Sequence, residues 1–266
     1  MDRIGSDPID IPAHAREHIH GLWDALAGFG AARIEETMRH VLAELSVLLD
    51  AGQAYWLGSV RLSRNADPLG GWRPAGIRYL HPPNVPPTHY DDHCKLIEKG
   101  EVDPSIVANV AGAGTFRINI KHEIVPPEWF QSAFHATFFA PYAIRDVIYM
   151  VMPLGEDIES WFGFQRIGDG ASSFGAFDRA LLEYAGRPLK WFHRLIALHY
   201  GLFLAEAPLT PSERRVLACL LGSGTEGAIA AELGLTPATV HTYATRIYRK
   251  FNVQGRAGLA ALWLGQ

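Results

Sequence analysis

The stretch from Pro237 to Phe251 places small polar and cationic side chains along one side of a helix. Its apolar residues recur at about 3.6-residue spacing and form the opposite side, which suits burial. The apolar side consists of Val240, Ala244, Ile247 and Phe251, and the polar side of His241, Thr242, Thr245, Arg246 and Arg249, with Lys250 at its edge. Polar side chains of this kind hydrogen-bond base edges in a DNA groove, and cations meet phosphates. The expected chemistry is therefore recognition of double-stranded DNA.

Local signals place three further helices around this one. Thr210 is suited to cap the first of them, with Pro211 at the first helical position and Glu213 closing a capping box. Another helix is expected over residues 225–233, and the last over residues 255–264. Two short helices, a glycine turn and a longer helix with a polar outer side make a helix-turn-helix.

The same stretch carries several short motifs in a fixed order. They are Leu209-Thr210-Pro211-Ser212-Glu213, Ile229-Ala230-Ala231-Glu232-Leu233, Thr239-Val240, Ile247-Tyr248-Arg249-Lys250 and Arg256. Together they resemble the LuxR/GerE-type helix-turn-helix of transcription regulators. By position, the resemblance implies base contacts at His241, Thr242 and Thr245, and phosphate contacts at Thr236, Thr239, Arg246 and Lys250.

The sequence departs from the family pattern on its DNA side. His241 and Tyr243 stand where the family often has lysine and histidine, and Phe251-Asn252 replaces a frequent Leu-Gly. A histidine in place of a lysine lowers the fixed positive charge of this side and could make DNA binding sensitive to pH. The alternative interpretation is a neutral, hydrogen-bonding His241.

The charge of the chain is divided unevenly. The 266 residues have a net charge of -4, yet the segment from Pro208 to Gln266 has six bases and three acids and so a charge of +3. The remaining residues therefore carry -7. A basic end on an acidic body agrees with nucleic-acid binding at that end.

Composition excludes several classes of protein. Hydrophobic residues make up 48% of the chain, which is too many for a disordered protein. No apolar run reaches the roughly 20 residues of a membrane helix, and residues 1–16 lack the apolar region of a signal peptide. Cys94 and Cys219 are the only cysteines, which excludes a disulfide scaffold. We expect a cytoplasmic protein without membrane contact.

The long N-terminal part alternates helix-like and strand-like segments. Helices are expected over residues 34–50 and 177–204, and strands over 54–62, 116–120, 147–152 and 160–166. This order predicts an α+β sensor domain over residues 1–205, with an antiparallel sheet and flanking helices, similar in architecture to GAF and PAS domains. An all-α, four-helix helix-turn-helix domain is expected over residues 206–266.

Three N-terminal motifs extend the family resemblance. They are Trp56-Leu57-Gly58-Ser59-Val60-Arg61, Asp67-Pro68-Leu69-Gly70-Gly71-Trp72-Arg73-Pro74 and Trp161-Phe162-Gly163-Phe164. They are similar to motifs in the N-terminal regions of one group of LuxR-type regulators, and they indicate no particular ligand. The spacing of Tyr55, Trp56 and Asp67 differs from that of acyl-homoserine-lactone receptors.

Aromatic residues of this domain could line an apolar pocket for a small or aromatic molecule. The residues predicted to bind such a ligand are Trp56, Trp72, Tyr79, Phe116, Trp129 and Trp161, with Phe130 as a further candidate. The alternative is that these side chains only build the core.

A cluster of potential metal ligands lies in a short stretch, consisting of His89, Asp91, Asp92, His93 and Cys94. Residues so contiguous cannot all converge from one regular element, so we expect a solvated loop and no metal site. Catalytic motifs are weak as well, because the Gly112-Ala113-Gly114 stretch lacks the third glycine of a dinucleotide fingerprint and no nucleophile elbow is present. We expect neither an enzyme nor a cofactor.

These patterns predict a DNA-binding transcription regulator controlled by a small molecule in its N-terminal domain. One helix-turn-helix makes few phosphate contacts, so we expect a homodimer on a palindromic operator with half-sites about 34 Å apart. The residues expected to couple the domains are Trp191, Phe192, Leu195, Ile196, Leu198, His199 and Leu202. One alternative is a constitutive, ligand-independent DNA binder whose large domain dimerises or recruits RNA polymerase. Another is an enzyme fused to a DNA-binding domain.

Overall fold

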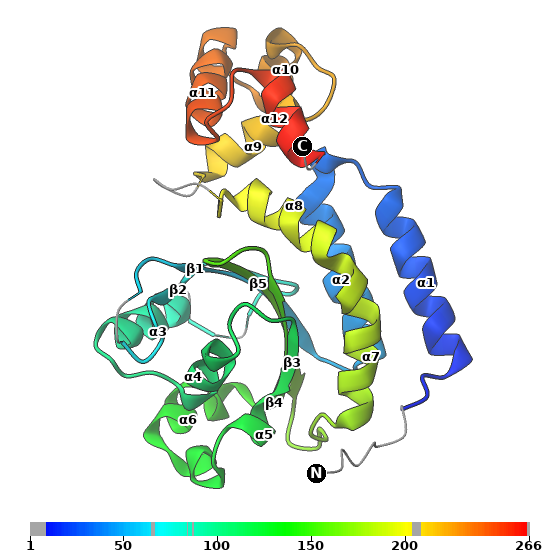
Figure 1. Ribbon diagram of the computed structural model, residues 1–266, viewed down its shortest axis with the longest axis vertical. Coiled ribbons are helices and arrows are strands. Elements are labelled where there is room, and N and C mark those ends of the chain that lie inside the picture. Colours follow the sequence, from blue (N-terminus) through cyan, green and yellow to red (C-terminus); the bar gives the residue numbers. More distant parts are fainter. Residues whose placement is uncertain (1–8, 65–66, 84, 87, 204–208, 265–266) are drawn as a thin grey trace.

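The computed structural model shows a small helical lobe above a larger body of helices and strands (Figure 1). It describes residues 9–64, 67–83, 85–86, 88–203 and 209–264. The predicted domain boundary at residues 205 and 206 lies outside these residues. No helix within them is long and apolar enough to cross a membrane.

The centre of the body is an antiparallel sheet, which in the described part of the chain has five strands in the order β2-β1-β5-β4-β3. The strands are β1 (Gln53–Arg61), β2 (Trp72–Tyr79), β3 (Arg117–Ile120), β4 (Ile144–Pro153) and β5 (Ile158–Ile167). Successive residues of β4 and β5 are buried on both faces of the sheet. The sheet therefore needs a covering layer on each side.

One face of the sheet packs against three helices, and a fourth covers these from outside. The inner helices are α2 (Ile34–Leu48), α7 (Ala176–Gly186) and α8 (Lys190–Tyr200), and the outer one is α1 (Ala13–Ala27), with 3-10 turns at Ala31–Arg33 and Arg187–Leu189 (Figure 1). The main core lies between this layer and the sheet, where Trp56, Phe162 and Phe192 are fully buried.

The other face carries short helices and turns. They are α3 (His89–Glu98), α4 (Pro104–Ala111), α5 (Lys121–Ile124) and α6 (Ala133–Phe138), with 3-10 turns at Pro127–Gln131 and Ala140–Tyr142. Asp103 caps α4 by accepting a hydrogen bond from the Ser105 amide at 2.9 Å. Two small apolar clusters, one around Trp72 and one around Trp161, replace a continuous core on this side.

The upper lobe consists of α9 (Pro211–Leu220), α10 (Glu226–Leu233), α11 (Pro237–Lys250) and α12 (Arg256–Trp263). The predicted capping box is confirmed, because the Glu213 amide donates to Thr210 Oγ1 at 3.2 Å and the Thr210 amide donates to Glu213 Oε2 at 2.8 Å. Gly234 ends α10 at φ +66°, a conformation that favours glycine.

The expected fold class is confirmed, with local differences. Pro188 lies in the turn that divides the helix expected over residues 177–204 into α7 and α8, because proline cannot donate a helical hydrogen bond. Strand β2 was not expected, since it contains Pro74 and Gly76, residue types that strands seldom contain.

The expectation of a solvated loop around His89 is wrong. The segment forms α3, whose inner side faces the sheet. The residues on that side, Tyr90, His93, Cys94 and Ile97, recur at helical spacing. This spacing is the local signal that predicts the helix, whereas the metal-binding types of the side chains do not.

Lowering the pH below about 6.5 is expected to destabilise the body through His193. This fully buried side chain lies 2.7 Å from Ser160 Oγ, and burial lowers its pKa to about 3. Between these pH values the unfolded chain binds a proton that the folded chain excludes, so the free energy of unfolding falls by up to ~1.4 kcal/mol per pH unit. Urea unfolding across this range measures the slope. His193→Gln is expected to reduce it, whereas His14→Gln on the exposed side of α1 leaves it unchanged.

Candidate DNA-binding face and ligand cavity

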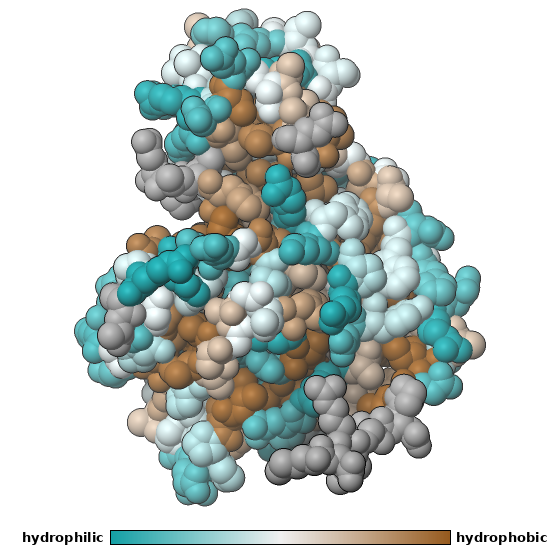
Figure 2. Space-filling model, viewed as in Figure 1, coloured by the Kyte–Doolittle hydropathy of each residue, from teal (hydrophilic) through white to brown (hydrophobic). Residues whose placement is uncertain are grey.

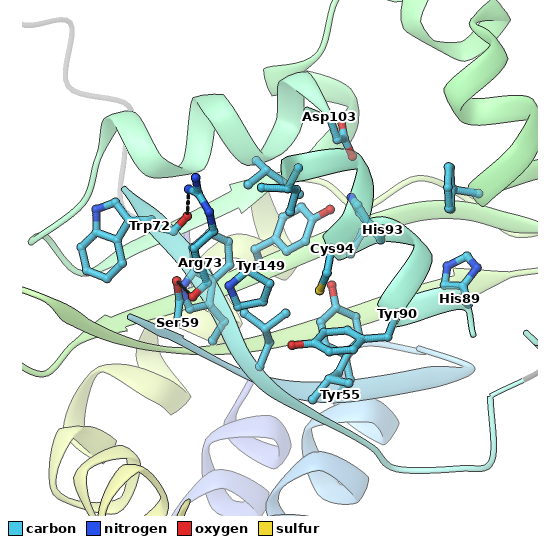
Figure 3. A pocket seen from close by; sticks show the side chains of 18 of the residues that line it. Tyr55, Ser59, Trp72, Arg73, His89, Tyr90, His93, Cys94, Asp103 and Tyr149 are labelled. Atoms are coloured by element: carbon cyan, nitrogen blue, oxygen red, sulfur yellow. Dashed lines mark hydrogen bonds between the residues drawn. The ribbon is translucent and has the colours of Figure 1, made fainter. Parts of the chain in front are cut away.

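A cavity of about 150 Å³ lies on the short-helix side of the sheet. Its floor comes from β1, β2, β4 and β5, and its other walls come from α3, α4 and the segment around Phe138. Figure 3 shows Tyr55, Tyr90, Cys94 and Tyr149 projecting into the same space between the sheet and α3. Most of the lining is apolar or aromatic, as in sites for small molecules.

The structure brings three of the six predicted ligand-binding residues to this cavity: Trp72, Tyr79 and Trp161. Trp56 lies on the opposite face of the sheet, because successive residues of β1 alternate between faces and its neighbours Tyr55 and Leu57 line the cavity. Phe116 packs against the main core on the long-helix side.

Trp129 and Phe130 do not line the cavity either. Trp129 lies in the turn Pro127–Gln131, where its ring packs against Phe139 at 5.1 Å between centroids. The cavity residues that the sequence analysis missed include Tyr55, Asp103 and Tyr149. The alternation of β1 could have indicated Tyr55, but nothing local indicated the other two.

The motif from Asp67 to Pro74 forms a turn at one end of the cavity. Asp67 Oδ1 accepts hydrogen bonds from the amides of Leu69 and Gly71 at 2.8 and 3.0 Å, and Oδ2 pairs with Arg73 at 2.8 Å. A side chain at Gly71 would place its Cβ 1.8 Å from the Ser63 carbonyl oxygen, so the turn requires glycine there. The motif thus positions Leu69 and Trp72 in the cavity wall.

A buried ion pair lies at the α4 end of the cavity. The Lys121 ammonium lies 2.8 Å from Asp103 Oδ2 and 3.1 Å from Ser105 Oγ, and both charged side chains are 2% exposed. The aromatic rings of Trp129 and Phe139 face the ammonium at 4.4 and 3.7 Å. Burial lowers the pKa of Lys121, while Asp103 opposes that shift. The positive charge of Lys121 and the negative charge of Asp103 thus neutralise each other inside the protein.

In the lobe, α11 places the predicted DNA-contacting residues as its helical spacing implied. Val240, Ala244 and Ile247 are fully buried, and the opposite side is exposed. Its exposed residues are Thr236, His241, Thr242, Thr245, Arg246 and Arg249, and Thr239 and Lys250 are half-buried. The described residues around this side leave it uncovered.

Several of these side chains also have partners within the lobe. Thr236 Oγ1 caps α11 by accepting from the Thr239 amide at 3.2 Å. Lys250 Nζ lies 2.8 Å from Glu213 Oε2, which links the end of α11 to the capping box of α9. His241 Nδ1 lies 3.2 Å from Glu226 on α10. DNA binding would therefore compete with an acid for His241.

Residues 207–263 match the family model described as bacterial regulatory proteins, luxR family. The lobe is a LuxR-type helix-turn-helix domain. Its family is one of transcription regulators, a non-enzymatic class, and double-stranded DNA is the partner that such a domain implies. Within the LuxR-type domain, Arg256 holds the end of α9 by donating to the carbonyl oxygens of Leu220 and Gly224, each at 2.6 Å.

The chain is also similar to solved structures of low sequence identity. One is SdiA in complex with octanoyl-rac-glycerol, with 12% identity, a TM-score of 0.48 and coverage of 97% of this chain and 96% of that one. Another is the VqsR LBD domain from Pseudomonas aeruginosa, with 16% identity, a TM-score of 0.47 and coverage of 69% and 96%. A second structure of SdiA, from Escherichia coli, has 13% identity, a TM-score of 0.45 and coverage of 94% and 96%. No curated protein sequence matches the chain.

The LuxR-type domain docks on α8 and the start of α2. Leu198 of α8 is a buried member of its core, and Ala31 and Leu195 pack against that core. Figure 2 shows apolar surface in the notch where the lobe meets the body. The LuxR-type domain and the body therefore contribute side chains to one apolar cluster.

Polar contacts reinforce this junction around Glu35. Its Oε1 accepts from the Tyr200 hydroxyl at 3.1 Å and lies 3.4 Å from His199 Nε2 and 3.8 Å from Arg214 Nε. The hydrogen bond with His199 is the main cause that lowers the pKa of Glu35 to about 2. The Arg214 guanidinium also lies over the Tyr200 ring at 5.0 Å. Residues of α2, α8 and α9 thus meet in one cluster.

Proposed function

We propose that this chain is a transcription regulator in which a small molecule, bound in the cavity, controls operator binding by the LuxR-type domain. The observation that supports control by a ligand is the position of β1, which lies between the cavity and α8, the helix on which the LuxR-type domain docks. Tyr55 and Leu57 of β1 face the cavity, and Trp56 between them stacks on Tyr200 of α8 at 4.4 Å. Tyr200 in turn contacts Arg214 of α9.

A ligand acts through this contact only if it binds one arrangement of β1 more tightly than another. A change at Tyr55 or Leu57 would then move Trp56, the Tyr200 ring and the docked domain. The cavity supports this function over constitutive DNA binding, for which a filled core would suffice. We further propose that the protein acts as a homodimer, because two recognition helices are needed for several phosphate contacts on two half-sites.

The function is tested by measuring operator affinity by fluorescence anisotropy, with and without a small-molecule extract of the producing cells. The parent chain is expected to change its affinity by about 5- to 150-fold when the extract is present. Equal affinity in both conditions would show a constitutive regulator, and absence of any operator binding would refute the DNA assignment.

Arg214→Gln is expected to reduce the ligand-induced change in operator affinity about fivefold. It removes the cation over Tyr200 and the charge beside Glu35, which together amount to ~1 kcal/mol of coupling. Affinity with and without the extract, compared for both forms, measures the effect. Arg215→Gln removes the same charge from the exposed next position of α9 and should leave the ratio unchanged. If the extract changes operator affinity by the same factor in Arg214→Gln and in the parent chain, the ligand does not act through Arg214.

A further inference from the structure

The cavity floor contains a row of aligned residues that crosses the sheet. Tyr79 of β2 pairs with Tyr55 of β1, Tyr55 pairs with Gly163 of β5, and Gly163 pairs with Tyr149 of β4. Residues paired in this way project from the same face of neighbouring strands. Three phenol rings therefore share one level of the floor, with a glycine between the second and the third.

Gly163 is the position that makes room for Tyr55. A Cβ at Gly163 would lie 2.2 Å from Tyr55 Cζ and 2.5 Å from its hydroxyl oxygen. The Tyr55 ring therefore lies flat across β5, and any side chain at this position would push the ring up into the cavity. The motif Trp161-Phe162-Gly163-Phe164 thereby sets the depth of the site.

Two hydroxyls of the row are available to a ligand. Within the described residues, neither the Tyr55 nor the Tyr79 hydroxyl makes a hydrogen bond, whereas the Tyr149 hydroxyl accepts one from Lys121 at 3.4 Å. Burial raises the pKa of Tyr79 to about 12 and that of Tyr55 further, so both retain their protons as donors. A hydroxyl that faces an apolar cavity without a hydrogen-bond partner favours a ligand that supplies an acceptor.

The charges of the lining are already paired. Asp103 is compensated by Lys121 and Arg73 by Asp67, each at 2.8 Å. Burial lowers the pKa of His89, and that of His93 to about 4, so both imidazoles are neutral at pH 7. An ionised ligand group would lose its hydration here without gaining a counter-charge.

The size of the site limits the body of the ligand. A cavity of about 150 Å³ is comparable to one that holds a benzene ring. The floor offers the rings of Trp161, Trp72 and Tyr149 for stacking or edge contacts.

We propose that the cavity binds an uncharged, single-ring compound whose carbonyl oxygen accepts a hydrogen bond from the Tyr55 hydroxyl, with Gly163 setting the space for the ring. The assignment deepens the proposed function, and it rests on that function for the regulatory role of the ligand. Binding itself is measured on the full chain without DNA, so the two proposals can fail separately.

The test compares three probes of nearly equal shape: acetophenone, benzoate and ethylbenzene. Ligand-observed NMR on the full chain at pH 7.5 is expected to show acetophenone binding. Ethylbenzene, which lacks the acceptor, should bind about tenfold more weakly, and benzoate at least about 100-fold more weakly. Equal binding of benzoate or ethylbenzene, or binding of none of the three, would overturn the assignment.

Two substitutions locate the binding within the row. Tyr55→Phe is expected to lower acetophenone affinity to that of ethylbenzene while leaving ethylbenzene binding unchanged. Gly163→Ala should weaken both probes, and the circular dichroism of this variant verifies that it folds. Tyr184→Phe removes a hydroxyl from α7, outside the cavity, and serves as the matched control. Unchanged acetophenone affinity in Tyr55→Phe would contradict the proposed hydrogen bond.

Discussion

Replacing Lys121 by methionine is expected to lower the free energy of unfolding by about 3–5 kcal/mol. The ammonium is 2% exposed, and its removal leaves the equally buried Asp103 carboxylate without its counter-charge. Methionine fills similar volume against Trp129 and Phe139, so the loss is chiefly electrostatic. Urea unfolding followed by circular dichroism measures the change.

A double variant separates the buried charge from lost packing. Asn at position 103 can still cap α4 by accepting from the Ser105 amide, but it carries no charge. Lys121→Met with Asp103→Asn should therefore recover most of the stability that the single substitution loses. If the single and double variants are equally unstable, the uncompensated carboxylate is not the cause.

Replacing Arg246 and Arg249 by glutamine is expected to weaken operator binding about 50-fold per chain at 0.1 M salt. Both side chains are exposed on the uncovered side of α11, and each phosphate contact contributes about 0.9 to the slope of affinity against salt concentration. The slope should therefore fall by about two per chain. Anisotropy titrations between 0.05 and 0.3 M salt (roughly the range in which such contacts dominate) provide both quantities.

The matched control is Arg145→Gln, which removes an exposed cation at the start of β4 in the body. It should leave both affinity and slope unchanged. A loss of affinity in the Arg246 and Arg249 variant that is the same at every salt concentration would show that these residues do not meet phosphates. The proposed base contacts of His241, Thr242 and Thr245 would then need a different docking of α11.

The LuxR-type domain was predictable in detail because its signals are local. Capping by Thr210, the αL glycine at position 234 and the apolar spacing in α11 each depend on residues within a few positions of one another. In the body, short apolar runs and, at residues 116–120, alternation predicted most strands for the same reason. The break at Pro188 was also a local signal, which the long apolar pattern obscured.

The cavity depended on the sheet as a whole. As an aromatic residue, Trp56 was predicted to contact a ligand. Whether it faces the cavity or the main core depends on the alternation of β1 and on which layer covers each face of the sheet. The row Tyr79, Tyr55, Gly163 and Tyr149 requires the register of three strand pairings, none of them visible in a short window of sequence.

By itself, the sequence determined the helix-turn-helix, its exposed polar side and the α+β class of the body, since periodicity and capping act over single turns and strands. Only the tertiary structure decided which aromatics line a cavity, that Asp103 neutralises Lys121 and that Arg214 meets Tyr200 and Glu35. These contacts join residues far apart in the chain. They depend on strand register and helix packing, which the whole fold sets together.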